Sequence, residues 1–275
     1  MRLLLLLVVG CSEYGIQGEK SDNLGTELDT ASPDTATPED GDTGEPEDTA
    51  GDPNNEEPPP ADAPVYANTG GQLFEVEPIT GERTLIGTFI DADSGTAITP
   101  FVDIAIDLEG RMYGGTFDAL YQIDPSDATV REICAPDAGM VALTFTSDGE
   151  LIAGGDDGVH IININNCRVT ALVTEGDYMT SGDLVGLPDG YLYWTVETSS
   201  RDGLVRVDPL TGDTTYIGDV GYSEIFGLGY DEGELFGFNS WGETITISPS
   251  TAEATELIAD DEMAWYGATT NPVQW

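Results

Sequence analysis

Carboxylic acids are the most abundant source of possible chemistry in this sequence of 275 residues. It contains 52 Asp and Glu residues against 8 Lys and Arg residues, which gives a formal net charge of −44. Clustered carboxylates can coordinate a hard cation such as Ca²⁺, share a proton at a raised pKa, or lie in water. So negative a surface repels phosphate backbones, which excludes nucleic acid as a partner and leaves cationic proteins or neutral ligands such as sugars.

The single histidine limits the enzyme classes that the sequence can support. His160 stands alone in the segment VHIINI, so a multi-histidine zinc site cannot form. No serine or cysteine in a nucleophile motif lies beside it in the sequence, which excludes a Ser–His–Asp hydrolase. We therefore expect His160 on the polar face of a strand.

The first eleven residues, MRLLLLLVVGC, have the composition of an export signal. Arg2 precedes the apolar stretch Leu3–Val9, which is too short for a membrane-spanning helix of about 20 apolar residues. Residues Val8–Cys11 resemble a bacterial lipobox, which implies that residues 1–10 are a lipoprotein signal peptide and that Cys11 carries the lipid. The alternative is an ordinary signal peptide with an incidental cysteine. Ser12 follows Cys11 in place of an Asp that would favour inner-membrane retention, so we expect anchoring in the outer membrane of the cell envelope.

An acidic tether is expected between this anchor and the folded part of the chain. Residues 11–63 consist largely of Asp, Glu, Thr, Pro and Gly, with almost no large apolar side chain after Leu28. Such a segment buries too little apolar surface to offset its ordering entropy, so we predict that it is disordered. Like charges and three consecutive prolines at 58–60 should keep it extended. The alternative role is an acidic tail that binds cations or the cell wall.

Two kinds of hairpin recur along residues 64–275 and determine the expected fold. One has a Pro-, Gly-, Asp- or Asn-rich turn, as in LVRVDPLTGDTTYIG, and occurs at 73–87, 120–134, 159–173, 204–218 and 244–258. The other occurs at 103–116, 142–155, 183–196 and 227–239, with turn glycines Gly110, Gly149, Gly190 and Gly233. Two hairpins in a period of about 40 residues indicate the four-stranded blades of a β-propeller.

The two ends of the repeat predict how many blades there are and how the ring closes. The domain begins with three strands, near Val65–Asn68, Leu73–Glu77 and Thr84–Phe89, and ends with a lone strand, Trp265–Thr270. A first blade built from both ends of the chain leaves no open edge in the ring. We therefore expect an all-β propeller of five four-stranded blades over residues 64–275, present as a monomer.

The repeat L-x-x-[IV]-D-P-x-T-G-x-x-T-x-I-G, clearest at 204–218, resembles that of the YncE-like and quinoprotein-like bacterial propellers. The resemblance covers nearly all of residues 64–275, and it implies a fold and a binding role, not an activity. Relatives of this type commonly have six to eight blades, so five blades would be a departure. None of their quinone or metal motifs is visible, and no site residue is carried over from them.

Two aspartates are expected at the axis of the ring. Alignment of the first strands by their turns gives one equivalent position, occupied by Asp103, Ala142, Asp183, Gly227 and Gly267. This strand lines the central channel of a propeller, so Asp103 and Asp183 should face each other across a narrow funnel, with Glu224 and Glu262 at its rim. Three roles stay open for these acids: solvated or structural charge, a calcium site ligated by Asp103 and Asp183, and acid–base catalysis.

Aromatic side chains are expected on the loops at the same end of the strands, which we call the top face. They are Phe117, Tyr178, Tyr222, Trp241 and Trp265. Exposed aromatics beside polar groups bind sugars or peptides, whereas buried ones pack between blades, as we expect for Trp265. Trp241, in the segment GFNSWGE, is the main candidate for contact with a ligand.

Cys134 and Cys167 are the cysteines that remain if Cys11 is lipidated. Two cysteines in an oxidising compartment suggest a disulfide. Their expected places argue against it, because the two ends of an outer strand lie about 15–20 Å apart. A disulfide needs Cα atoms within about 7 Å, so the pairing stays open.

The function expected from these residues is that of a membrane-anchored, extracytoplasmic binding module. Its ligand would be a protein, a peptide or a glycan at the top face, and its only membrane contact would be the lipid. The alternative is a carboxylate-dependent glycoside hydrolase or lyase. That enzyme would need a carboxyl pair about 5–9 Å apart beside an open cleft, which a binding module would not.

Overall fold

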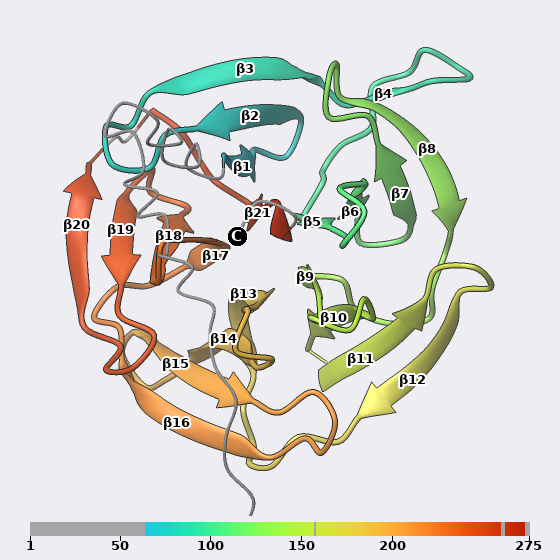
Figure 1. Ribbon diagram of the computed structural model, residues 1–275. Coiled ribbons are helices and arrows are strands. Elements are labelled where there is room, and N and C mark those ends of the chain that lie inside the picture. Colours follow the sequence, from blue (N-terminus) through green and yellow to red (C-terminus); the bar gives the residue numbers. More distant parts are fainter. Residues whose placement is uncertain (1–63, 157, 260–261, 273–275) are drawn as a thin grey trace, which may run out of the picture. The chain divides into compact units, whose positions relative to one another are not determined.

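The structure, a computed structural model, describes residues 64–156, 158–259 and 262–272. Five antiparallel sheets stand around a central axis, so the predicted five-bladed β-propeller is confirmed (Figure 1). The signal peptide and the tether fall on residues 1–63, outside the described residues, and stay predictions. Among the residues that the structure describes, no helix has the length and apolarity needed to cross a membrane.

Each blade has four strands, named in order from the axis outward. Blade 1 contains β21 (Gly267–Thr270), β1 (Val65–Asn68), β2 (Gln72–Val76) and β3 (Arg83–Thr88). Blade 2 contains β5 (Asp103–Ile106), β6 (Met112–Gly115), β7 (Leu120–Ile123) and β8 (Thr129–Cys134). Blade 3 contains β9 (Ala142–Phe145), β10 (Leu151–Gly155), β11 (Gly158–Asn163) and β12 (Arg168–Leu172).

The last two blades follow the same order. Blade 4 contains β13 (Thr180–Gly186), β14 (Leu192–Glu197), β15 (Asp202–Val207) and β16 (Thr214–Asp219). Blade 5 contains β17 (Ile225–Asp231), β18 (Glu234–Asn239), β19 (Thr244–Ile247) and β20 (Ala254–Ile258). The sequence did not predict β4 (Ile90–Asp91), which pairs in parallel with β8 at the outer edge of blade 2.

Burial along the strands follows their distance from the axis. Every residue of the innermost strands β5, β9 and β21 is buried, whereas the outer strands β3 and β16 have no buried residue. The turns between the first and second strands contain the predicted glycines, with φ values of 79°, 85°, 86° and 95° for Gly110, Gly149, Gly190 and Gly233. A side chain rarely adopts this conformation, which explains the glycine at each turn.

The apolar core is divided into five clusters, one between each pair of neighbouring blades. Leu73 and Ile104 belong to the cluster between blades 1 and 2, and Leu204 and Leu228 to that between blades 4 and 5. The cluster between blades 5 and 1 contains Trp265. Blade 1 therefore takes its innermost strand from the C-terminal segment and its other strands from the start of the domain, as predicted.

The outer strands run along the circumference of the ring, so each ends at the outer turn of the next blade (Figure 1). That turn has one residue with a left-handed backbone in every blade: Gly81, Ala128, Cys167, Gly212 and Ala252. The segment that ends the preceding outer strand lies against this residue, as Ile258 does at Gly81 and Gly218 at Ala252. The same contact therefore recurs around the ring.

A disulfide joins Cys134 and Cys167 at this contact between blades 2 and 3. Their Cα atoms are 6.2 Å apart, so the expected separation of 15–20 Å was wrong. That estimate treated neighbouring outer strands as lying side by side. Because the twist of each blade turns its outer strand along the circumference, the end of β8 meets the turn before β12.

Candidate functional site

The axial position of the repeat is confirmed as the point where the five blades meet. Asp103 begins β5 and Asp183 lies within β13, and both residues are fully buried. Their carboxyl groups are hydrogen-bonded to each other. The two acids face each other as expected, but the inner strands close around the pair, so the narrow funnel expected there is not open to solvent.

Backbone N–H groups from all five blades point at the two carboxyl groups. Asp103 accepts hydrogen bonds from Ile104, at 2.7 Å, and from Leu143. Asp183 accepts hydrogen bonds from Leu184, Leu228 and Ala268. Each donor follows the axial residue of its own blade, so two side chains satisfy five converging donors that would otherwise be buried without partners.

The pKa values of both axial carboxyl groups are raised, that of Asp183 to about 8. Burial raises the pKa of Asp103 well above the usual carboxyl range, and the charge of Asp183 and the hydrogen bond between them raise it further. Burial also raises the pKa of Asp183, while the hydrogen bonds from Asp103 and the backbone oppose the rise. Their mutual hydrogen bond raises the pKa of Asp103 and lowers that of Asp183, so Asp103 is the donor and Asp183, which also accepts three backbone N–H groups, is the acceptor.

Asn68 completes the axial centre, although no motif in the sequence singles it out. Its Nδ2 donates to the carbonyl oxygens of Thr69, at 3.1 Å, and Phe101, at 3.4 Å, which fixes the orientation of the amide. Its Oδ1 is buried beside Asp103 and has no hydrogen-bond partner among the described residues. A Cβ atom on Gly267 would lie only 2.2 Å from Asp103 Oδ1, so only glycine fits there.

The chemistry that this centre can perform is limited by its burial. A ligand at the surface does not reach Asp103 or Asp183 in this structure, and a hydrogen-bonded pair lacks the separation and cleft of a glycoside hydrolase. No group of three or more His, Cys, Asp or Glu side chains among the described residues is placed to hold a metal ion. Calcium binding by Asp103 and Asp183 stays a prediction, in which Ca²⁺ would compete with five N–H donors for the same oxygens. To test this prediction, the melting temperature of the protein is measured in calcium chloride and in sodium chloride at equal ionic strength.

An open hollow of about 520 Å³ lies on the top face between blades 4 and 5. We call it the acidic hollow. It is lined by Ser181, Glu197, Thr198, Ser199, Ser200, Arg201, Asp202, Ser223, Glu224 and Phe226. The predicted residue Glu224 thus lies on a pocket, although not on the axial one that the sequence suggested.

Asp202 forms the wall of the acidic hollow and is only 4% exposed. Its Oδ2 accepts the N–H of Ile225 at 2.9 Å, which joins blade 4 to the first strand of blade 5. Burial raises the pKa of Asp202, and the charges of Glu197 and Glu224 add to the rise. Asp202 was not among the predicted site residues, because an Asp before a Gly at a strand start is common in turns.

Trp241 is 61% exposed and directly follows Ser240, which contacts Glu224 of the acidic hollow. The loop that carries it is fixed by the buried Asn239, whose Oδ1 accepts the N–H groups of Trp241, at 3.1 Å, and Glu243, at 2.9 Å. Ser240 connects this loop to the hollow, since its N–H donates to the Glu224 carbonyl at 3.1 Å and its hydroxyl donates to the Glu224 carboxylate. Glu224 itself has a left-handed backbone, with φ of 57°. The structure therefore connects the loop of Trp241 to Glu224, and both residues are exposed, whereas Asp103 and Asp183 are fully buried.

The other predicted aromatics have different roles. Trp265 is 2% exposed and packs edge-on against Phe74 and Phe238, so the packing role expected for it is confirmed. Tyr178 is half-buried and stacks with Tyr216. Phe117 is 61% exposed, like Trp241, but belongs to a loop of blade 2.

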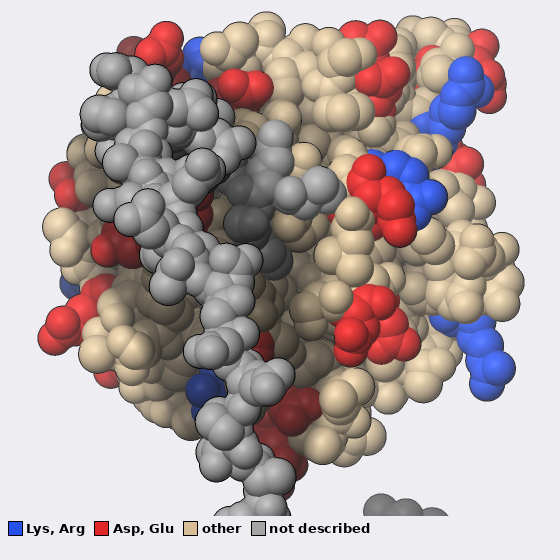
Figure 2. Space-filling model, viewed as in Figure 1, with Lys and Arg blue, Asp and Glu red and all other residues tan. Residues whose placement is uncertain are grey.

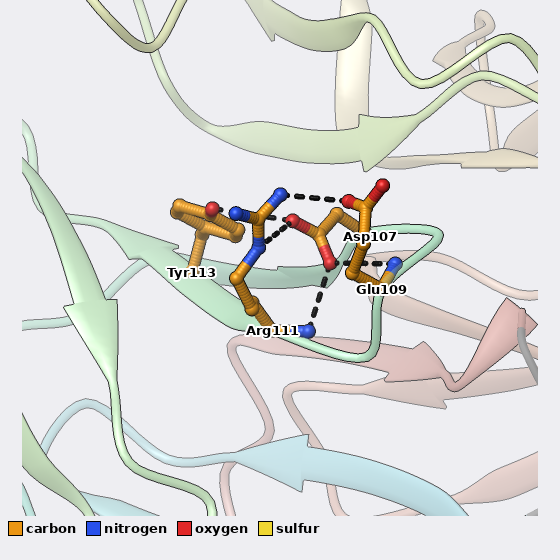
Figure 3. A network of polar contacts seen from close by, with 4 residues as sticks. All are labelled: Asp107, Glu109, Arg111 and Tyr113. Atoms are coloured by element: carbon orange, nitrogen blue, oxygen red, sulfur yellow. Dashed lines mark hydrogen bonds and ion pairs between the residues drawn. The ribbon is translucent and has the colours of Figure 1, made fainter.

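A second polar cluster lies at the opposite end of the strands, in the turn between β5 and β6 (Figure 3). Asp107 accepts the N–H groups of Glu109 and Arg111, the Arg111 Nε at 2.6 Å and the hydroxyl of Tyr113 at 3.2 Å. Arg111 lines a hollow of about 410 Å³ together with Arg131, which pairs with Asp93 at 2.8 Å. Because both guanidinium groups are already paired with carboxylates, this hollow is a weaker candidate for an anion.

His160 is a buried residue of β11, 8% exposed, and not a polar-face residue as expected. Its strand lies third from the axis and is covered on both sides by neighbouring strands. It lies in a different blade from the acidic hollow, so it takes no part in that site.

Comparisons with known proteins support the fold alone. No protein-family model matches the sequence, and no curated protein matches it significantly. A chain from the crystal structure of a nidogen/laminin complex matches 78% of this chain and 100% of its own, with a TM-score of 0.52 and 11% identity. TolB from Acinetobacter baumannii matches 72% of this chain and 51% of its own, with a TM-score of 0.45 and 15% identity. The resemblance to YncE-like and quinoprotein-like propellers is not tested by these matches.

Proposed function

We propose that this protein is a binding module of the cell envelope. In this proposal the lipid on Cys11 anchors it to the membrane, residues 12–63 act as a tether, and the top face of the propeller binds a protein, peptide or glycan. The domain would face the periplasm or the cell surface. A structure that shares its fold comes from a complex of two proteins, which is a reason to include proteins among the ligands tested.

The observation that carries the proposal is the contrast between the closed axis and the open acidic hollow. The axial carboxyl groups are fully buried and hydrogen-bonded, whereas the hollow offers carboxylates and hydroxyls to solvent and contacts the loop that carries the exposed Trp241. The loop of Trp241 is fixed by hydrogen bonds before any ligand arrives, so little entropy is lost when the ligand binds. Rigid exposed aromatics beside polar groups are common in binding sites.

A ligand screen with one pair of matched variants tests this proposal. The purified protein is screened against glycans, peptidoglycan fragments and peptides, and each ligand found is titrated into Trp241→Ala and Phe117→Ala. Both side chains are 61% exposed, but only Trp241 belongs to the loop whose Ser240 contacts Glu224 of the acidic hollow. We expect Trp241→Ala to weaken binding at least about tenfold and Phe117→Ala to leave it unchanged. Equal effects of the two variants would contradict a site at the hollow.

The anchoring step has its own test. We expect Cys11→Ser to move the protein from the membrane fraction to the soluble fraction, because the lipid is the only anchor that the proposal includes. Cell fractionation and detergent-phase partitioning of the parent and the variant measure this. Unchanged partitioning of Cys11→Ser would refute lipidation at this cysteine and leave the binding role to be judged by the ligand screen.

A further inference from the structure

An open hollow of about 410 Å³ lies on blade 2, between the turn that joins β5 to β6 and the turn that joins β7 to β8. We call it the blade 2 hollow. Two of the 8 basic residues of the chain line it, Arg111 and Arg131. Its other polar side chains are those of Gln122, Asp124 and Thr129. The volume is within the range of about 300–1,000 Å³ that is common for the sites of small ligands.

Blade 3 has a hollow at the equivalent place in the repeat, and it shows what the fold itself requires. Its volume is about 220 Å³. Arg111 aligns with Glu150, because each follows the turn glycine of its blade, and the strand registers align Gln122 with Ile161. Both Glu150 and Ile161 line the blade 3 hollow. A blade therefore folds without a guanidinium or an amide at these positions, so the repeat does not explain Arg111 and Gln122.

A buried carboxylate fixes Arg111 at the edge of the blade 2 hollow (Figure 3). Arg111 Nε donates to Asp107, which is 2% exposed, and Nη2 donates to Glu109, so Nη1 can donate to a ligand. The same buried turn position is Thr146 in blade 3 and Leu187 in blade 4, where the backbone makes the same two hydrogen bonds. The turn therefore needs no carboxylate. Asp107 instead positions the guanidinium, although a buried charge is costly.

The long connection between blades 1 and 2 contributes the other wall and fixes Arg131. Residues 89–102, between β3 and β5, are the longest of the five connections from one blade to the next, and they project from the ring beside β4 (Figure 1). Ala92 of this connection lines the hollow, and its N–H donates to the Val130 carbonyl at 2.9 Å. Asp93 accepts a hydrogen bond from Arg131 Nη1 at 2.8 Å. Carboxylates thus hold two guanidinium groups at one hollow.

The charges around the blade 2 hollow do not favour an ionic ligand. An anion would have to displace the carboxylates of Asp93 and Glu109 from the two guanidinium groups. Acidic side chains are also spread over the face shown in Figure 2, with basic ones at few places, so an anion is repelled from a distance. A cation in the hollow would meet the two guanidinium groups. A neutral polar ligand avoids both costs.

We propose that the blade 2 hollow binds one ring of a neutral sugar. Each sugar hydroxyl both donates and accepts hydrogen bonds, and the hollow offers both kinds of partner. The guanidinium groups and the Gln122 amide can donate, and Asp124 and Thr129 can accept. Because carboxylates hold the guanidinium groups in place before a ligand arrives, the entropy cost of binding is lowered. The site is separate from the acidic hollow, so this inference goes beyond the proposed function.

Titration of the full chain with monosaccharides tests this inference, in a detergent whose headgroup is not a sugar. Saturation-transfer NMR detects the weak binding of a single ring, and calorimetry measures its Kd. The neutral probes are glucose, galactose, mannose and N-acetylglucosamine. We expect at least one of them to bind, and its uronic acid and amino sugar counterparts, which carry a negative and a positive charge, to bind more weakly.

Matched variants locate the site. Arg111→Ala should weaken binding of the neutral sugar about tenfold or more, because a hydrogen bond from a charged donor is lost. Arg168→Ala removes an exposed guanidinium from β12, outside the hollow, and should leave binding unchanged. Asp107→Leu, which introduces the residue type of blade 4, should also weaken binding because Arg111 loses its fixed orientation. In the Arg111→Ala background Asp107→Leu should have no further effect, whereas a general disturbance of the turn would still lower the affinity.

Four results would overturn the inference. They are the absence of binding by all four neutral sugars, tighter binding of the uronic acid, unchanged binding in Arg111→Ala, and an equal loss in Arg111→Ala and Arg168→Ala. A neutral sugar whose binding is lost in Trp241→Ala and kept in Arg111→Ala would overturn it while supporting the proposed function. Absence of sugar binding would leave the proposed function to be judged by the peptides and proteins of its own screen.

Discussion

At the scale of single residues, the axial aspartates illustrate how a position that looks functional can be structural. Their blades could have carried Ala or Gly there, as the other three blades do. Yet a buried N–H group without a partner costs about 1–3 kcal/mol, and five such groups converge on the axis. Two carboxyl groups are enough to satisfy them, so the ring needs acids in only some of its blades.

The two aspartates should respond differently to replacement by asparagine. In Asp103→Asn the new Nδ2 takes over the hydrogen bond that Asp103 donates to Asp183, and Oδ1 still accepts one N–H group. In Asp183→Asn a single carbonyl oxygen and an N–H donor replace a carboxyl group whose two oxygens accept three N–H groups. We expect Asp183→Asn to lower the free energy of unfolding by about 2–4 kcal/mol and Asp103→Asn by less than half of that. Urea unfolding at neutral pH measures both, and equal losses would contradict the assigned position of the proton.

The raised pKa values of the two aspartates should also make stability depend on pH. Because the pKa of the pair is raised in the folded state, the folded protein retains a proton that the unfolded chain loses above about pH 4. The free energy of unfolding should therefore fall as the pH rises from about 4 towards the raised pKa of the pair, and then level off. Asp103→Asn should reduce this slope, and Asp118→Asn, an exposed replacement, should not. A slope that is the same in all three proteins would show that general charge repulsion is its cause.

At the scale of strands and turns, local sequence patterns predicted the strands correctly. They did not predict how each blade twists or how it is oriented relative to the next blade. The turn glycines and the alternation of the hairpins depend on neighbouring residues, so they predicted the strands of all five blades. The contact between Cys134 and Cys167 depends on how far each blade twists, which no short segment specifies. The same holds for Asp202 and the acidic hollow, since they arise where the end of one blade meets the start of the next. The aligned position of Asp103 and Asp183 was correct, but their burial was not predictable from one sequence.

The disulfide should stabilise the junction of blades 2 and 3 beyond the packing that the other four junctions have. It links residues 33 apart in sequence, and the loop-entropy estimate for such a link is about 3–4 kcal/mol. We expect Cys134→Ala/Cys167→Gly to lower the free energy of unfolding by about this amount, with glycine suited to the left-handed turn at 167. Urea unfolding without reductant measures the loss.

The single variant Cys134→Ser is the control for the bond itself. It removes the disulfide with a smaller change in packing, so it should cost nearly as much as the double variant. Reductant should lower the stability of the parent to that of the variants and leave the variants unchanged. If the variants are as stable as the oxidised parent, the bond adds nothing to the junction.

At the scale of the whole molecule, the ring is held together by five apolar clusters and one closing strand. Each cluster needs the blade on both sides, so loss of one blade exposes two clusters at once. The closing strand β21 pairs with β1 over four residues and supplies Ala268, whose N–H reaches Asp183 at the axis. We expect deletion of residues 264–275 to abolish cooperative unfolding, because it removes the innermost strand of blade 1 and one axial donor together.

Trp265 and Trp241 give the sharpest test of ring closure, because they are the same residue type and differ in burial. Trp265 is 2% exposed and fills the cluster between blades 5 and 1, where it touches Phe74 and Phe238. Trp241 is 61% exposed on the top face. We expect Trp265→Ala to lower the free energy of unfolding by about 3–5 kcal/mol, the usual cost of removing a large buried aromatic side chain. Trp241→Ala should change it by less than about 0.5 kcal/mol while it weakens ligand binding. Urea unfolding of both variants measures the difference, and a Trp265→Ala variant as stable as the parent would show that the C-terminal segment does not close the ring.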